Sequence, residues 1–113
     1  MQIKVDKPPK IEKHPGCVAG ALSIVGNKWT ALLVMELAKG SARFTTFEQA
    51  LVGISPRTLS QRLDDLEQHG IITKVSYAEV PPRVEYTLTD KGRDLIPILK
   101  SMALWGNKYF KDN

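Results

Sequence analysis

The sequence predicts one small α+β domain in which helices come first, a β-hairpin follows and a last helix ends the chain. Up to about residue 70, apolar residues recur every three or four positions, which is the period of a helix with one buried face. Between residues 71 and 89 the period falls to two, which is typical of a strand with one buried face. The 113 residues allow one modest core. We therefore expect a single domain over residues 16–110, with a short tail at 111–113.

Composition and charge indicate an ordinary globular chain. Hydrophobic residues make up 42% and charged residues 25%, which excludes a disordered or low-complexity chain. The longest purely apolar run, 31–35, is far shorter than a membrane span, and residues 1–10 lack the apolar core of a signal peptide. With one cysteine, a disulfide scaffold is excluded. These features predict a cytoplasmic protein with no membrane partner, and its net charge of +4 permits a polyanionic one.

An extended arm and two helices are predicted first. Residues 1–15 hold three prolines among charges, which favours an extended arm. Apolar residues at helical spacing predict a helix over 17–25, and a Gly-Asn pair interrupts it. Residues 28–39 form the second helix, which Gly40 ends. This helix is apolar nearly all round, so we expect it to be the buried central helix.

Capping signals predict two further helices. The third begins at Thr45, because Thr45-Thr46-Phe47-Glu48 has the capping-box pattern, and it ends near Leu51. The fourth begins at Ser55-Pro56, a preferred N-cap followed by a proline in the first turn, and it continues to His69. One face of this helix is expected to enter the core, and its residues are Leu59, Leu63 and Leu66.

Two strands and a last helix complete the chain. Alternation predicts strands over 71–77 and 83–89, joined by a stiff loop, Glu79-Val80-Pro81-Pro82, that leaves the hairpin protruding. Thr89-Asp90 caps a last helix that runs to about Tyr109, with a kink at Pro97. This order of elements is that of a winged helix-turn-helix, in which the fourth helix lies in the DNA major groove and the hairpin, or wing, flanks it. The alternative is a winged-helix module that binds a protein and no DNA.

The fourth helix carries the candidate DNA-reading side chains. At 100° per residue, Arg57 and Gln61 point away from the leucine face, with Thr58 beside them. Arginine can bond guanine with two N–H groups, and glutamine can do the same with adenine. The alternative is that these side chains are merely solvated. The flanking residues, suited to phosphates or neighbouring elements, are Ser55, Ser60 and Arg62.

Arg83 stands at the edge of the proline loop, where its side chain can reach a phosphate or a minor groove. The alternative for Arg83 is a cross-strand pair with a neighbouring glutamate. Weaker phosphate candidates, each with a solvated alternative, are Lys28, Arg43 and Lys74.

The last helix has a wide apolar arc that covers about half of its circumference, more than one core needs. A surface of this size predicts a homodimer, because it would otherwise be a liability. The alternative is that the whole arc packs on its own domain. The arc includes Leu99, Met102, Trp105 and Tyr109.

Several motifs together resemble the HxlR family of bacterial winged-helix transcriptional regulators. They are Gly26-Asn27-Lys28-Trp29, Arg43-Phe44, Ile54 to Leu63, Leu66-Glu67, Tyr77 to Thr89, Leu104-Trp105-Gly106 and the early Cys17. The resemblance covers about residues 16–107 and implies a homodimeric DNA-binding regulator of neighbouring genes. It also implies dimer contacts from the first helix, with Val18 and Leu22 as candidates, as well as from the last. Val18 itself departs from the family, because many relatives have proline there.

Cys17 is a candidate sensor of reactive electrophiles or oxidants. It lies at the first turn of a helix, where the dipole favours a thiolate, and the resemblance adds that some relatives sense such compounds with a cysteine here. A bridge between subunits could join Cys17 only to its own copy, so alkylation or a mixed disulfide with a small thiol is the expected chemistry. The alternative is a half-buried packing cysteine.

Neither an enzyme nor a cofactor is expected. The chain has no phosphate-binding loop and no nucleophile elbow. Its two histidines, His14 and His69, show no metal-ligand spacing with Cys17, so no metal is expected either.

Overall fold

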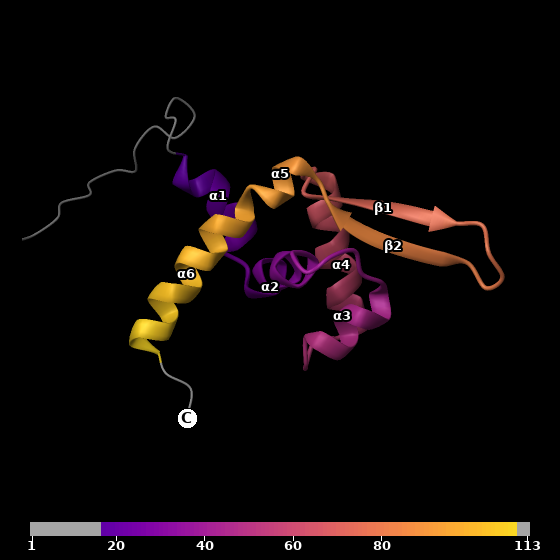
Figure 1. Cartoon of the computed structure of the whole chain (residues 1–113), viewed down its shortest axis with the longest axis horizontal. Coiled ribbons are helices and arrows are strands. Elements are labelled where there is room, and N and C mark those ends of the chain that lie inside the picture. Colours follow the sequence, from indigo (N-terminus) through magenta and orange to yellow (C-terminus); the bar gives the residue numbers. More distant parts are fainter. Residues whose placement is uncertain (1–16, 111–113) are drawn as a thin grey trace, which may run out of the picture.

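The computed structural model describes residues 17–110, so His14, the predicted arm at 1–15 and the predicted tail at 111–113 lie outside the described residues. The elements follow the predicted order, with the wing at one end of the molecule and the first and last helices at the other (Figure 1). An α+β winged helix-turn-helix is therefore confirmed. The elements are α1 (Val18–Val25), α2 (Lys28–Leu37), α3 (Phe44–Ala50), α4 (Pro56–Gln68), β1 (Ile72–Tyr77), β2 (Arg83–Leu88), α5 (Asp90–Arg93) and α6 (Leu95–Tyr109).

The turn between α1 and α2 is fixed by polar contacts. The side-chain oxygen of Asn27 caps α2 by accepting the Thr30 N–H at 3.2 Å, and the buried Thr30 hydroxyl donates to the Ile24 carbonyl. A Cβ on Gly26 would lie 2.4 Å from the Leu22 carbonyl oxygen, so this tight turn requires glycine. Among residues 17–110, no single helix is long and apolar enough to span a membrane; α1 and α2 pass that test only as a pair, which is bent by 78°.

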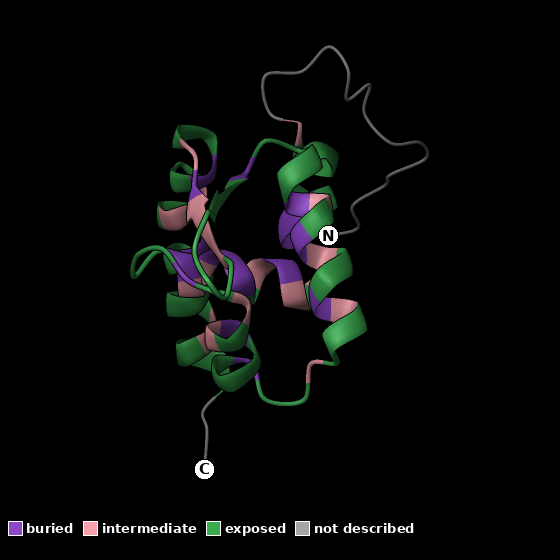
Figure 2. Ribbon diagram, turned by 90° about the vertical axis from the view of Figure 1, so that its right-hand side faces the viewer, coloured by how far each residue is buried: buried purple, intermediate pink, exposed green. Residues whose placement is uncertain are grey.

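α2 forms the centre of the core. It packs against α1, α3, α4, α6 and β2, and Leu33 and Val34 are fully buried. Figure 2 shows the buried residues gathered around this helix, with exposed residues on the outer faces. The prediction of a central helix is confirmed, although Leu32 remains exposed on one side.

The start of α3 differs from the prediction. The helix begins at Phe44, and the capping box expected from Thr45 does not form. Instead, the Thr46 hydroxyl accepts the Arg43 N–H at 3.4 Å. The cause lies outside the helix, because Ala42 exchanges two backbone hydrogen bonds, of 3.0 and 2.8 Å, with β2. This bridge holds the chain extended up to Arg43, so the helix starts at the next residue.

α4 forms as its capping signals predict. Pro56 is its first residue, and the Ser55 Oγ accepts the Thr58 N–H at 3.1 Å. The helix ends before Gly70, whose φ of +73° lies in the left-handed region that favours glycine. The buried residues of α4 are Leu59, Leu63 and Leu66, as expected.

The hairpin is antiparallel, with Ile72 opposite Leu88 at its base and Tyr77 opposite Arg83 near its tip. The predicted strands are confirmed, and each is one residue shorter than expected at the base.

The end of the chain forms two helices instead of one. The break falls at Asp94, three residues before the predicted kink at Pro97. A proline ring clashes with the carbonyl four residues earlier, here that of Arg93, so the disturbance precedes the proline. α5 packs closely on the turn after α4, where a Cβ on Gly92 would lie 2.2 Å from the Ile71 carbonyl oxygen. This contact ties the last two helices to the end of α4.

Candidate DNA-binding surface and dimer face

The outer face of α4 carries the two predicted base-reading side chains. Arg57 and Gln61 are exposed and lie one turn apart, opposite the buried leucines. Within residues 17–110, neither side chain makes a hydrogen bond or an ion pair. Ser60 is exposed on the same helix. The hydrogen-bonding groups of Arg57 and Gln61 are therefore free to meet an external partner.

Ser55 and Thr58 lie together at the N-terminus of α4. The Ser55 hydroxyl donates to the Thr58 Oγ1 at 2.9 Å and accepts the Thr58 backbone N–H at 3.1 Å. The Thr58 hydroxyl therefore keeps its own proton for another acceptor. Both residues stabilise the helix start and still present polar groups at the surface.

Arg62 is less accessible than the sequence suggests. Its Nη2 lies 3.3 Å from a carboxylate oxygen of Asp65, three residues further along α4, and its side chain is only 23% exposed. Its Nε is buried without a hydrogen-bond partner. The side chain lies along the flank of the helix, where the ion pair neutralises part of its charge.

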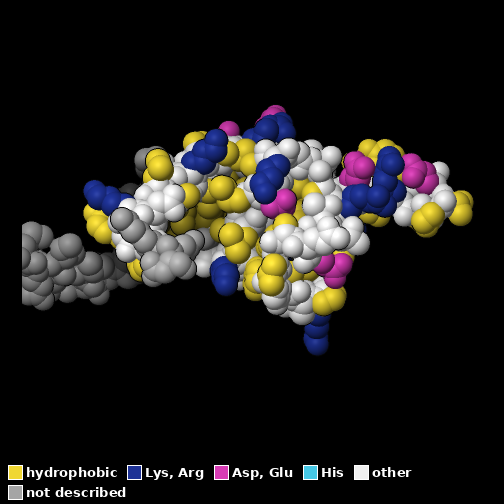
Figure 3. Space-filling view, turned by 60° about the horizontal axis from the view of Figure 1, so that its bottom comes forward, with side chains coloured by type: hydrophobic (Ala, Val, Ile, Leu, Met, Phe, Trp, Pro, Cys, Tyr) yellow, Lys and Arg dark blue, Asp and Glu magenta, His cyan; other side chains and the backbone are white. Residues whose placement is uncertain are grey.

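Arg83 is held by neighbours in the wing. Its Nη1 lies 3.2 Å from Glu79 and its Nε 3.3 Å from Glu85, while the guanidinium lies over the Tyr77 ring, 4.2 Å from the ring centre. The glutamate pairing considered from the sequence is thus present, but neither glutamate lies across the strand pair: one is in the loop and the other is two residues along β2. Figure 3 shows basic side chains of the wing between acidic ones.

Of the weaker candidates, Lys74 belongs to the wing itself, and Arg43 lies beside the wing. With Phe44 and Thr45 of α3 and with Pro82 and Val84 of the hairpin, it lines a shallow groove of about 220 Å³. This neighbourhood could not be predicted from local sequence patterns, because it depends on the bridge between Ala42 and β2. The other two, Lys28 and Lys74, are exposed, and the Lys28 ammonium lies 5.0 Å from the centre of the Trp29 ring.

Tyr86 holds the base of the wing against the helices. Its ring meets that of Phe47 edge to face, with centres 6.0 Å apart. Burial raises the pKa of the Tyr86 hydroxyl above its usual value, and the carboxylates of Asp64 and Glu67 add to this effect. The phenol is therefore neutral at physiological pH, and the wing is anchored by packing without an ion pair at this residue.

Apolar side chains cover the outer faces of α1 and α6. Trp105 is 60% exposed and lies against Tyr109, with ring centres 5.1 Å apart. The assignment of Leu99 to the dimer interface was wrong. This residue is buried in the core of its own domain, because it faces α2 and not the outside. The candidates that remain exposed on these two helices are Val18, Leu22, Met102, Trp105 and Tyr109.

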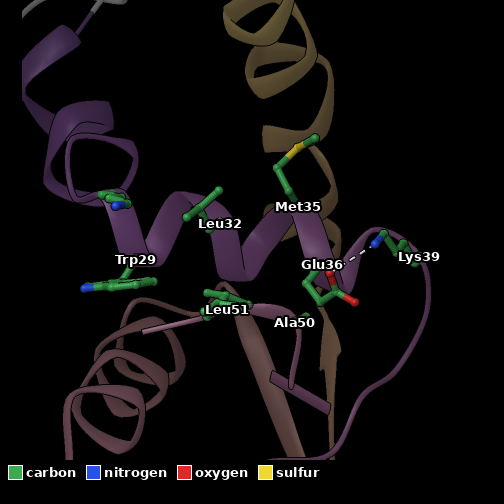
Figure 4. A pocket seen from close by; sticks show the side chains of 9 residues that line it. Trp29, Leu32, Met35, Glu36, Lys39, Ala50 and Leu51 are labelled. Carbon is green, nitrogen blue, oxygen red and sulfur yellow. Dashed lines mark hydrogen bonds and ion pairs between the residues drawn. The ribbon is translucent and has the colours of Figure 1, made fainter. Parts of the chain in front are cut away.

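A cleft that the sequence did not reveal lies between α2 and the turn after α3 (Figure 4). It has a volume of about 350 Å³, and its walls are mostly apolar, with an ion pair of 3.1 Å between Glu36 and Lys39 at one end. Figure 3 shows hydrophobic side chains lining a hollow on the body of the molecule, away from the wing. The apolar residues of the cleft are Trp29, Leu32, Met35, Ala50, Leu51 and Val52.

Cys17 is the N-cap of α1. Its sulfur accepts the Gly20 N–H at 3.2 Å, and the residue is half-buried. A Cβ on Gly20 would lie 3.0 Å from this sulfur, so little room is left on that side. Within residues 17–110, no group of three His, Cys, Asp or Glu side chains is placed to hold a metal ion.

The family model described as HxlR-like helix-turn-helix matches residues 24–113. The chain belongs to this family. A relative from Bacillus subtilis, the uncharacterized HTH-type transcriptional regulator YvaP, is 41% identical over 101 residues, which are 89% of this chain and 87% of the relative. This HxlR-like chain is accordingly a DNA-binding transcriptional regulator, and the relatives place it among regulators and not among enzymes.

Solved structures agree with this assignment. The redox regulator HypR in its oxidized form is 37% identical with a TM-score of 0.79, and the match covers 84% of this chain and 98% of HypR. The reduced form of the transcriptional regulator YodB from B. subtilis is 32% identical with a TM-score of 0.75, covering 87% of this chain and 95% of YodB. The fold and the regulatory class are thus shared along nearly the whole length of these proteins.

Proposed function

We propose that this regulator binds a pseudo-palindromic DNA operator as a homodimer, with one α4 in each of two major grooves. The observation that carries the proposal is the pair of unengaged side chains, Arg57 and Gln61, on the one face of α4 that the core does not use. Both can bond base edges with two groups at once, which is how a helix in the major groove distinguishes sequences. Because its partner is duplex DNA, we place the protein in the cytoplasm.

Contacts to phosphates would surround this face. Ser55, Thr58 and Ser60 present hydroxyls near the N-terminus of α4, where backbone N–H groups also favour an anion. Arg83 would reach a phosphate from the wing. Arg62 would contribute less, since it is paired with Asp65.

The dimer would form through the outer faces of α1 and α6. Their exposed apolar side chains lie at the end of the molecule opposite the wing (Figure 1), so pairing there leaves α4 and the hairpin open to DNA. A two-fold interface uses the same surface on both subunits, and this surface is self-complementary in its apolar character. Two α4 helices one DNA turn apart, about 34–36 Å, or a multiple of it, would follow.

Selection from a pool of randomised duplexes tests the proposal. We expect enrichment of an inverted repeat whose half-sites are separated by one helical turn or a multiple of it. Binding should weaken by about 10³- to 10⁵-fold between roughly 50 and 200 mM salt, as for a dimer that contacts about 6–10 phosphates. A winged-helix module that binds only protein would enrich no sequence and would show no such salt dependence.

We further propose that Cys17 makes this regulator responsive to electrophiles. HypR is described as a redox regulator and has been solved in oxidized and reduced forms, and YodB has been solved after diamide treatment. The Cys17 sulfur caps α1, one of the two helices of the proposed dimer face, and the space between this sulfur and Gly20 is small. A thiolate that attacks a quinone carbon forms an S–C bond, and the displaced electron pair takes a proton from solvent. The bulky adduct would shift α1 and, through the dimer, the spacing of the two α4 helices.

The test compares operator binding before and after treatment with benzoquinone. We expect affinity to fall several-fold in the natural protein and to stay constant in Cys17→Ser, which keeps a side-chain oxygen as the helix cap. An equal response in both proteins, or none in the natural one, would remove the sensor and leave the DNA-binding proposal intact.

A further inference from the structure

In the wing, Arg83 is neutralised by two carboxylates, one on each side of its guanidinium. Glu79 faces Nη1 at 3.2 Å and Glu85 faces Nε at 3.3 Å, and the side chains of all three residues remain between 27% and 47% exposed. We propose that Glu79 and Glu85 form a clamp that DNA must open before Arg83 can hold a phosphate. The clamp sets the strength of DNA binding and leaves sequence preference unchanged. This inference rests on the proposed function.

The geometry of the hairpin builds the clamp. Residues two apart on a strand share a face, so Arg83 and Glu85 point to the same side of β2. Tyr77 in β1 lies directly opposite Arg83, and the guanidinium packs on the face of its ring. The Glu79 N–H donates to the Tyr77 carbonyl at 2.8 Å, which folds the loop back and brings the Glu79 carboxylate to Arg83. All three partners are therefore fixed by local backbone geometry.

The donors of Arg83 explain why DNA would have to open this arrangement. An arginine holds a phosphate best with two parallel N–H groups from its planar fork. Nη1 and Nε lie 3.2 and 3.3 Å from carboxylate oxygens, and Nε is buried and makes no hydrogen bond within residues 17–110. Nη2 is the guanidinium nitrogen for which no ion pair is found within those residues. Nη2 alone can offer only a single-nitrogen contact. A fork-like grip on a phosphate needs Nη1 or Nε, so Glu79 or Glu85 must leave.

The net charge of the wing also supports the clamp. Residues 72–88 contain two basic side chains, Lys74 and Arg83, and two acidic ones, Glu79 and Glu85, so the wing has no net charge. A neutral wing adds little attraction to a polyanion until a carboxylate moves aside. Arg57 on α4 differs, because no carboxylate pairs with it within residues 17–110. Opening the clamp therefore acts on phosphate contacts, while base contacts remain with α4.

The experiment measures affinity for the selected operator and for an unrelated duplex in the natural protein, in Glu79→Gln/Glu85→Gln, in Arg83→Gln and in the triple variant. Glu48→Gln, an exposed glutamate on α3, controls for the loss of one negative charge. A surface ion pair is worth about 1.4- to 5-fold in an equilibrium, so two pairs predict about 2- to 25-fold tighter binding in the double variant. We expect this gain on both duplexes equally and larger than the square of the fold-gain of Glu48→Gln, because the double variant loses two negative charges and the control loses one. We also expect the gain to shrink when Arg83 is absent.

The outcomes separate the clamp from simple repulsion. If the carboxylates only repelled DNA, the gain from removing them would be as large or larger in the Arg83→Gln background, and the clamp would be refuted. Weaker binding by the double variant would show that the glutamates position Arg83 for DNA, which also overturns the proposal. Natural protein that binds no duplex would overturn the proposed function and the clamp together, whereas the first two outcomes leave the proposed function standing.

Discussion

Helices α4 and α6 each bury one face in the same core, and they differ in what the opposite face presents. α4 buries three leucines and exposes Arg57 and Gln61. α6 buries Leu99 and exposes Met102 and Trp105. A polar outer face with free donors suits a hydrated, charged partner, whereas an apolar outer face is stable only when it is covered. On this ground we propose DNA as the partner of α4 and a second copy of the chain as the partner of α6.

The largest effect is expected inside α6, where neighbouring residues differ in burial. Leu99→Ala should lower the free energy of unfolding by about 2–5 kcal/mol, because it removes a buried side chain and leaves a cavity. Ile98→Ala, one residue earlier and half-exposed, is the matched control and should cost clearly less. Urea unfolding at one protein concentration measures both. Equal losses would mean that Leu99 does not mark the buried face.

Substitutions on the outer face of α6 should weaken association of the dimer and leave the stability of the fold nearly unchanged. Trp105→Ala is expected to weaken the dimer by about 2 kcal/mol or more, since each interface contains two copies of this aromatic anchor. Lys100→Ala, a substitution at an exposed residue of α6, is the control and should leave the dissociation constant of the dimer unchanged within error. Sedimentation equilibrium measures the dissociation constants of both variants. A natural protein that stays monomeric at high concentration would contradict the dimer assignment.

The two helices also begin differently, which predicts a smaller effect. Ser55 caps α4 with its hydroxyl, but Asp94 makes no side-chain cap at the start of α6. Ser55→Ala should therefore cost about 0.5–2 kcal/mol of stability, and Asp94→Ala should cost less. Thermal unfolding of the two variants, compared with the natural protein, checks this order. A larger loss of stability in Asp94→Ala than in Ser55→Ala would show that the side-chain cap of Ser55 does not stabilise α4 as proposed.

Much of the fold could be predicted because its signals are local. The Ser55-Pro56 start and the leucine spacing of α4 lie within one helix, and both predictions are confirmed. The start of α3 could not be found in this way, because it depends on a bridge between Ala42 and a strand far along the chain. The prediction of one last helix with a kink at Pro97 was wrong, because the disturbance falls on the residues before the proline and divides the segment at Asp94.

The site shows the same limit. The outward direction of Arg57 and Gln61 could be predicted because the direction of a side chain on a straight helix follows from its position, whereas their contact with bases stays a prediction. Leu99 was assigned to the dimer face in error, since an apolar arc does not show which part of it meets α2. The partners of Arg83 depend on how the proline loop folds back, which the alternation of the strands does not determine.

The most direct test of base reading by α4 is the ratio of affinities for the selected operator and an unrelated duplex in Arg57→Ala/Gln61→Ala protein, with the dimer verified in the same sample. Each side chain should contribute about 1–3 kcal/mol of discrimination, and binding to the unrelated duplex should change little. We expect a ratio that falls towards one while the dimer stays intact. An unchanged ratio in an intact dimer would contradict base reading by α4.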